Sequence, residues 1–505
     1  MTSKFGKIHS AILHAVLQSF GCEVSQQASG SWSELLSGRN GLRSLALAGG
    51  VALHAVNVYI VATVLPSVVA DIGGLEYYAW NMTLFVVASI VGSAVTPKAI
   101  NDAGLRRSFL VAIALFSVAT AVCATAPFMG WMILGRTLQG FGGGMLLGLS
   151  YSSTRILFPE RLWPRAMALL SSMWGVATFI GPAVGGIFAE AGAWRWAFWS
   201  VILVSAGLAV LVITQVGARD TERSSVPVRV PTGQLAWMVV AVLLVSVASL
   251  SDQLIWSILG VLAGALITVH IARIDYRSAT PLMPKGAYRL GGHLGSLYAC
   301  MALLSLVMTA EIFIPYFLQI IQGFSPLAAG YFMVLMSAGW STGSIISSSR
   351  ALPATNRFMQ VGPVLTTVSL LGLAFVLPLY QPSDLLPLAT GAGVLLFGVG
   401  LGIGVIWPHL LTQLFHDSPK GQENIASAAI ITVQLYALAL GAAIGGMVTN
   451  AAGLTEPGGL AGTQHAALAL MLVLAVGPAV AAVLVRPVIR IRRARAASPA
   501  TAMPS

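Results

Sequence analysis

Long apolar runs separated by short polar stretches dominate the chain. A helix that spans the hydrocarbon core of a bilayer needs about 20 mostly apolar residues. Fourteen segments meet this requirement, and they lie near residues 44–69, 79–97, 107–126, 128–150, 164–190, 194–216, 235–251, 253–274, 293–320, 327–347, 358–380, 386–411, 424–449 and 464–486. The pattern therefore predicts an all-α polytopic membrane protein with fourteen transmembrane helices.

Basic residues concentrate in alternate polar stretches. If the N-terminus is cytoplasmic, every one of the 27 lysines and arginines except Arg136 and Arg195 falls in an inside loop or tail. Such a bias is typical of cytoplasmic loops. We therefore expect a multi-pass protein of a bacterial inner membrane with both termini in the cytoplasm. The basic tail, residues 487–505, is expected to face lipid headgroups.

Composition narrows the class of protein further. Hydrophobic residues make up 57% of the chain and charged residues only 9%, against about 25% charged in soluble domains. The net charge is +11, but the basic residues are spread over the stretches between apolar runs and form no single patch, so no nucleic-acid partner is expected. Three distant cysteines, at positions 22, 123 and 300, indicate neither a disulfide framework nor a metal site.

The N-terminal extension, residues 1–43, precedes the first apolar run. Its segment 8–20, followed by Gly21 and Cys22, only faintly resembles a lipoprotein cleavage site. We expect a cytoplasmic extension instead, with a short helix near residues 31–36.

An internal repeat is visible at an offset of 260 residues. The segment 181–186 echoes 441–446, and the glycines of 140–144 match those of 400–404. Repeats of this kind occur in transporters built from two related halves. The repeat predicts six-helix bundles at 44–217 and 293–486, with a linker and two inserted helices at 218–292.

Strongly polar side chains inside the apolar runs are candidates for function, because they are costly in a bilayer. Arg136 lies in the fourth run and Glu311 in the middle of the ninth, while His54 and Asn57 share a face of the first. A carboxyl in an apolar cavity favours its protonated form and can release the proton when the cavity wets or a cation approaches. We therefore expect Glu311, Arg136 and His54 to serve proton coupling; buried structural hydrogen bonds are the alternative.

Glycine-rich segments within the runs predict close helix packing rather than phosphate binding, because no strand precedes them. Pro182 is expected to kink the fifth helix. Asp102 is expected at the N-terminus of the third helix, where Arg106 and Arg107 can pair with it. A merely hydrophilic turn is the alternative there.

These motifs resemble those of the major facilitator superfamily, and specifically its fourteen-helix drug:proton antiporter family, over roughly residues 44–486. The similar stretches are 134–140, 175–186, 315–330 and the loop with Asp102 and Arg106. The resemblance implies alternating access between two halves. It also implies that Gly181, Pro182, Gly185 and Gly186 mark an exporter and seal the contact between the halves.

Two departures from the family pattern affect the expected mechanism. Asn57 stands where the family usually has an aspartate, so the first helix lacks the usual titrating acid, and His54 is its nearest titratable neighbour. Lys98 replaces an expected glycine in the loop motif.

The expected substrate cavity includes Asn57 and four aromatic side chains that could stack on flat or cationic ligands. These are Tyr59, Trp174, Phe313 and Tyr316. Packing between helices or against lipid explains the aromatic residues equally well.

The sequence thus favours a proton-coupled antiporter that exports drugs or other small amphipathic compounds. A dedicated metabolite exporter and an uncoupled facilitator are the alternatives. No enzyme is expected, because neither paired catalytic carboxylates nor a metal cluster is recognisable. The expected partners are a small molecule, protons and the lipid bilayer. The protein is expected to be a monomer that uses the proton motive force and no cofactor.

Overall fold

The computed structural model describes residues 31–217, 230–251, 253–289, 292–348, 354–379 and 385–497. Most of the N-terminal extension, part of the linker and the end of the basic tail lie outside these ranges. Every regular element within them is helical. The elements are α2 (Trp32–Leu36), α3 (Gly38–Ile72), η1 (Leu75–Tyr77), α4 (Trp80–Ala103), α5 (Leu105–Ala124), α6 (Met129–Leu157), η2 (Glu160–Leu162), α7 (Trp163–Glu190), α8 (Arg195–Gln215), α9 (Thr232–Ala248), α10 (Leu254–Tyr276), α11 (His293–Val307), α12 (Ala310–Gln322), α13 (Pro326–Ser348), α14 (Ala354–Val376), α15 (Leu385–His416), α16 (Glu423–Ala451) and α17 (Gly459–Ala497).

A helix occupies each of the fourteen predicted segments, but the ninth is broken into α11 and α12. By length and composition, eleven helical segments of the described chain could cross a membrane. The helix α9, with 17 residues, is shorter. The helices α6 and α13 are long enough, but their glycine and polar residues lower their hydropathy. The short helix expected near residues 31–36 is α2.

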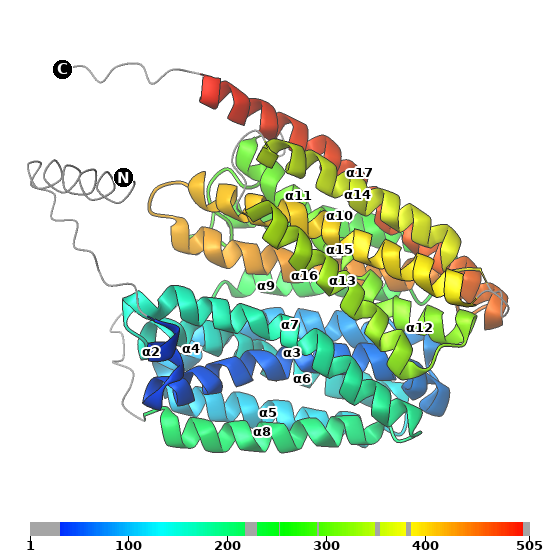
Figure 1. The fold of residues 1–505 in the computed structure, drawn as a ribbon, viewed down its shortest axis with the longest axis horizontal. Helices are drawn as coiled ribbons and strands as arrows, with labels where there is room; N and C mark the ends of the chain where they lie inside the picture. Colours follow the sequence, from blue (N-terminus) through cyan, green and yellow to red (C-terminus); the bar gives the residue numbers. More distant parts are fainter. Residues whose placement is uncertain are drawn as a thin grey trace, which may run out of the picture.

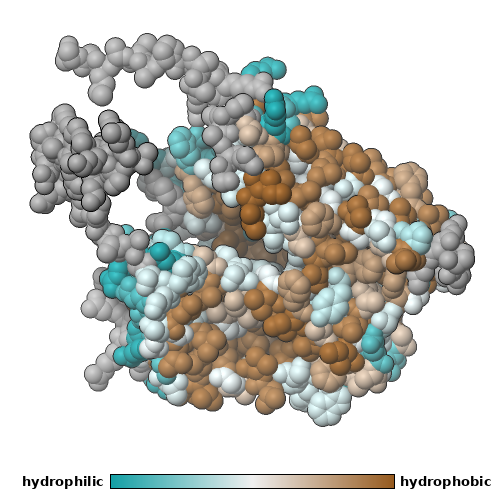
Figure 2. Space-filling view, in the orientation of Figure 1, coloured by the Kyte–Doolittle hydropathy of each residue, from teal (hydrophilic) through white to brown (hydrophobic). Residues whose placement is uncertain are grey.

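Large apolar side chains cover the outside of the molecule. Leu203, Leu266, Ile345 and Leu386 are each at least 71% exposed. Figure 2 shows apolar side chains over much of the visible surface. A water-soluble protein would not leave so many large apolar side chains uncovered, so the chain is a multi-pass membrane protein.

The helices form two groups that lie side by side in Figure 1, with α3 to α8 in one and α11 to α17 in the other. We call these the first and second halves. The inserted helix α9 bridges them, because Val242 and Val245 pack with Phe85 of α4 and Ala439 of α16. The other inserted helix, α10, packs on α9, where Gly260 and Ala248 meet closely.

Glycines let helices approach in the same way in both halves. A Cβ atom at Gly140 or Gly144 of α6 would collide with the backbone of α4. One at Gly400 or Gly404 of α15 would collide in the same way with the backbone of α13. Neither pair tolerates a side chain, which explains why glycines recur at one offset in the sequence.

The two ends of the helix bundle differ in their contacts. At one end, which we call the basic end, Arg161 pairs with Glu34 at 2.6 Å and Arg43 donates to the carbonyl of Leu157. At the opposite end, the far end, Arg195 pairs with Asp71 at 2.6 Å.

The far end is also where the halves are joined. Tyr78 Oη donates to the carbonyl of Ile312 at 3.2 Å, and Glu190 accepts the backbone N–H of Leu327. Asn450 Nδ2 donates to backbone carbonyls of η1 and of the turn after α9. The described contacts thus close the molecule at the far end.

Asp102 lies in the last turn of α4, so its predicted place at the start of the next helix was wrong. Gly104 has a φ of 80° and its N–H donates to the carbonyl of Ile100, which ends α4 one residue after Asp102. A carboxylate at a helix C-terminus opposes the helix dipole. Lys98 offsets this, because its ammonium lies 2.6 Å from Asp102 Oδ2.

Candidate functional site

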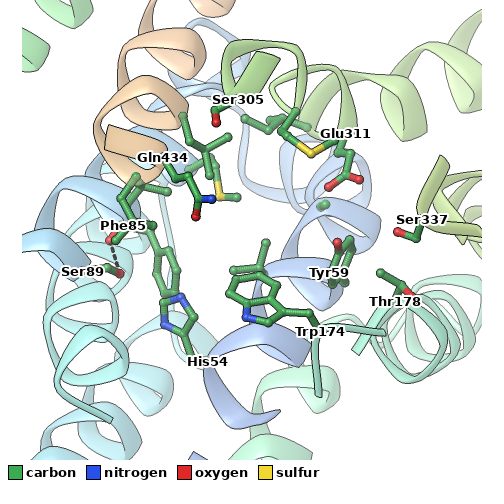
Figure 3. Close-up of a pocket in the computed structure, with 18 of the residues that line it drawn as sticks. His54, Tyr59, Phe85, Ser89, Trp174, Thr178, Ser305, Glu311, Ser337 and Gln434 are labelled. Atoms are coloured by element: carbon green, nitrogen blue, oxygen red, sulfur yellow. Dashed lines mark hydrogen bonds between the residues drawn. The ribbon is translucent and has the colours of Figure 1, made fainter. Parts of the chain in front are cut away.

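A cavity of about 520 Å³ lies between the two halves. The first half contributes residues of α3, α4, α6 and α7, and the second contributes residues of α11, α12, α13, α15 and α16. Figure 3 shows polar and aromatic side chains from both halves directed into it. Glu311 is the only acidic residue of its described lining, which contains no lysine or arginine.

Glu311 owes its position to the break between α11 and α12. The backbone N–H groups of Met308 and Thr309 donate three residues back, as do those of Glu311 and Ile312, so the α-helical ladder is interrupted there. Pro315 has no N–H and cannot donate to the Glu311 carbonyl. Glu311 consequently lies in the first turn of α12, where a carboxylate is favoured by the helix dipole.

Tyr59 of α3 connects Glu311 to the first half. Its hydroxyl interacts with the Glu311 carboxyl and with the Ser337 hydroxyl of α13. Figure 3 shows these three side chains on one side of the cavity. The carboxyl of Glu311 thus lies where the two halves meet. The sequence places Glu311 in the second half but does not show that it contacts the first.

Two further residues that the sequence singled out also line the cavity: Trp174, which packs near Tyr59, and His54 beyond it. The His54 ring stacks on Phe85 at a centroid distance of 5.2 Å and meets Trp174 edge-on at 5.9 Å. Such rings present flat surfaces on which planar or cationic molecules can stack. Trp340 and Trp407, which the sequence reasoning missed, add an aromatic pair from the second half at 5.0 Å.

Arg136 is fully buried in α6, and its described partners all belong to the first half. Its Nη1 donates to Asn57 Oδ1 at 2.6 Å and to Gln139 Oε1, and its Nε donates to the Asn81 carbonyl at 3.3 Å. Its guanidinium carbon lies 4.0 Å from the centre of the Phe85 ring. Arg136 and Asn57 thus form a buried network behind the cavity wall, and neither lines the cavity.

Phe313 and Tyr316, predicted as cavity aromatics, also do not line it. Their side chains pack around Tyr78, with ring centroids 5.6 Å and 5.1 Å away. Phe313 projects from a different face of α12 than Glu311 and Ile312, whereas Tyr316 lies one helical turn beyond Ile312, where its ring meets Tyr78.

The glycine motif of α7 lies along the seam between the halves. A Cβ atom at Gly181 would collide with Tyr59, and one at Gly185 would lie 2.9 Å from the Ile60 carbonyl. One at Gly186 would lie 2.5 Å from the Cα of Leu327 in α13. Pro182 is 3.0 Å from the Cβ position that a side chain at Gly330 would have. The motif therefore allows α7 to approach α3 within its own half and α13 in the other.

Comparison with known proteins identifies the architecture. The sequence profile of the Major Facilitator Superfamily matches residues 47–446. The chain belongs to the major facilitator superfamily. Membership indicates a transporter of small molecules rather than an enzyme.

Several members of the superfamily are similar over most of their length. A protein of Mycobacterium tuberculosis named a probable multidrug-efflux transporter is 37% identical over 432 residues, which cover 84% of this chain and 90% of that protein. Multidrug resistance protein 3 of Bacillus subtilis is 23% identical, covering 80% of this chain and 78% of that protein.

Solved structures of the superfamily share the fold. A bacterial homologue of the human lysosomal transporter Spinster, in an inward-facing and unoccupied conformation, has a TM-score of 0.63 at 14% identity and covers 93% of this chain and 100% of its own. A D-xylose-proton symporter has a TM-score of 0.57 at 12% identity, covering 87% and 97%.

Proposed function

We propose that this chain is a fourteen-helix drug:proton antiporter that exports drugs or other small amphipathic compounds by alternating access. The observation that carries the proposal is the cavity between the halves, whose described lining is mostly apolar and aromatic and includes a single carboxyl group, Glu311. The naming of its 37% identical relatives as probable multidrug-efflux transporters supports export.

Alternating access is supported by the uneven contact between the halves. Hydrogen bonds and close glycine contacts join them at the far end, through Tyr78, Glu190 and Gly186. Figure 2 shows a hollow between the halves. We assign the basic end to the cytoplasm on the positive-inside rule, so this arrangement is open to the cytoplasm and ready to load a compound for export.

Proton coupling is assigned to Glu311. Its carboxyl is half-buried in the cavity and interacts with Tyr59 across the seam. Burial in apolar surroundings favours a protonated carboxyl, while a bound cation favours the carboxylate. Competition between a proton and a substrate for one group would make the two travel in opposite directions.

The remaining parts of the proposal concern the setting. We place the chain in a bacterial inner membrane as a monomer with both termini in the cytoplasm, driven by the proton motive force without a cofactor. We count α6, α9 and α13 as spans, because they lie among helices that are long and apolar enough to cross a membrane. All fourteen predicted segments then cross the bilayer.

An uncoupled facilitator is the alternative that one observation favours. Asn57 cannot titrate, and it accepts a hydrogen bond from Arg136 instead of forming an ion pair. A dedicated exporter of one metabolite would differ in the breadth of its substrates.

Transport in proteoliposomes tests coupling. Wild-type protein, Glu311→Gln and Arg136→Ala are reconstituted, and movement of ethidium is followed with and without an imposed pH gradient. We expect the gradient to drive ethidium transport by the wild type, and Glu311→Gln to lose that dependence. Wild-type transport that ignores the gradient would leave the facilitator as the better description. Nile red, a neutral amphiphile, tests the breadth of substrates.

A further inference from the structure

The guanidinium of Arg136 is a buried cation surrounded by neutral partners. The side chain is 0% exposed, and its hydrogen bonds go to two side-chain amides and a backbone carbonyl. Within the described residues it forms no ion pair with a carboxylate. A buried charge is strongly destabilised unless an opposite charge lies close to it. The first half therefore has a positive charge that its own described side chains do not neutralise.

Two unpartnered hydrogen-bond donors flank this charge. Arg136 Nη2 and Asn57 Nδ2 are both buried without a partner, in side chains that are 0% exposed. The two side chains are joined by the 2.6 Å hydrogen bond from Arg136 Nη1 to Asn57 Oδ1, so both unpartnered donors belong to one buried network. Donors beside a positive charge select an anion and exclude a cation.

The site adjoins the central cavity. His54, Asn81 and Phe85 line the cavity and also lie around Arg136 or Asn57. Gly143 faces His54, where a Cβ atom would lie 2.8 Å from Nδ1, so the absence of a side chain at this position lets the His54 ring pack closely against α6. The unpartnered Asn81 Oδ1 is an acceptor that suits a water molecule arriving with the ion.

We infer that Arg136 and Asn57 bind one small inorganic monovalent anion of the halide class, such as chloride. The anion neutralises the guanidinium and serves as a resident counter-ion of the first half. A carboxylate on a bulky substrate does not fit this role, because neither Arg136 nor Asn57 lines the cavity. The assignment does not depend on proton coupling or on Glu311.

The test compares anions at equal ionic strength. The thermal unfolding midpoint of the detergent-solubilised full-length protein is measured in sodium chloride, sodium bromide and sodium gluconate. Because a ligand that binds only the folded state stabilises it, we expect the midpoint to be higher in chloride and bromide by roughly 2–4 °C and to rise with the logarithm of chloride concentration. An unfolding midpoint identical in chloride and gluconate would overturn the assignment.

Three variants locate the ion. Asn57→Asp supplies a built-in counter-ion next to Arg136, so the chloride effect should disappear. Asn356→Asp puts a carboxylate at another buried asparagine, in α14, and should keep the effect. Asn57→Ala removes one donor without adding charge and should weaken chloride affinity roughly 10-fold.

Retention of radioactive chloride on the immobilised protein measures that affinity directly, wherever the melting curves fail. Chloride affinity that is unchanged in both Asn57 variants would place the ion elsewhere and refute the site. Retention that does not saturate would indicate an adventitious ion only, with the same consequence.

Discussion

Replacing Tyr78 by phenylalanine removes one hydroxyl group from the contact that closes the far end. That hydroxyl donates to the Ile312 carbonyl at 3.2 Å, directly beside Glu311 in the sequence, while the ring packs on Phe313 and Tyr316. Tyr78 is 1% exposed, so water does not compete for the bond while the halves are in contact. The substitution therefore weakens the far-end-closed state and leaves the aromatic packing in place.

The size of the effect follows from the value of one hydrogen bond. A neutral hydrogen bond contributes about 0.5–1.5 kcal/mol net, which corresponds to roughly a 2- to 12-fold change in an equilibrium constant. We expect Tyr78→Phe to shift the ratio of far-end-open to far-end-closed molecules toward the open state by a factor in this range.

Distance measurement between spin labels follows that ratio. Labels are attached to cysteines at Ala191 and Ala461, which are exposed at the far end in different halves, after the native cysteines are replaced. Tyr77→Phe is the matched control, because the Tyr77 ring contacts Trp80 within the first half. A distance distribution in Tyr78→Phe that matches both wild type and Tyr77→Phe would refute the role given to this hydroxyl.

Three further outcomes are expected. Gly144→Leu should prevent folding or destabilise the protein by about 1–3 kcal/mol or more, because the added side chain collides with the α4 backbone; Gly207→Leu, at a position with open space, should melt like wild type in the same unfolding assay. The hydrogen bond from Arg161 lowers the pKa of Glu34, so the docking of α2 is stabilised above the ordinary glutamate pKa and loses that stabilisation as pH falls through the lowered value. The protection of residues 32–36 against hydrogen exchange, taken relative to the intrinsic exchange rate at each pH, should therefore fall in acid in wild type but show no such added loss in Arg161→Ala. Trp174→Ala should weaken ethidium binding several-fold and Trp174→Phe much less, because an aromatic face in the cavity is kept; equal affinities in a fluorescence titration would contradict its place in the substrate cavity.

The helices themselves were predictable, because apolar runs and the repeated glycines follow directly from what a bilayer and close packing require. The positions where helices break or end were harder to predict. The interruption at Met308 and Thr309 lies inside a continuous apolar run, where hydropathy carries no signal. Gly104 marks the end of α4, because a glycine with a positive φ commonly follows a helix. The sequence interpretation did not use this signal and placed Asp102 in the next helix.

The candidate site was predictable only in part. Glu311, His54, Tyr59 and Trp174 line one cavity, as their polar or aromatic character suggested. Which neighbours face it depends on the rotation of each helix, and an apolar helix surrounded by lipid and protein gives little periodic signal for that rotation. Tyr78 was missed for a different reason: it lies in a short turn before α4, and its partner is a backbone carbonyl of the other half.

Proton release on substrate binding tests the central claim most directly. Ethidium is added to the solubilised wild-type protein in weakly buffered solution near neutral pH, and the protons that appear are counted with a pH indicator. If Glu311 exchanges a proton for substrate, the wild type should release up to about one proton per bound ethidium, and Glu311→Gln should bind ethidium more weakly and release none. Equal proton release by the two proteins would contradict the assignment of coupling to Glu311.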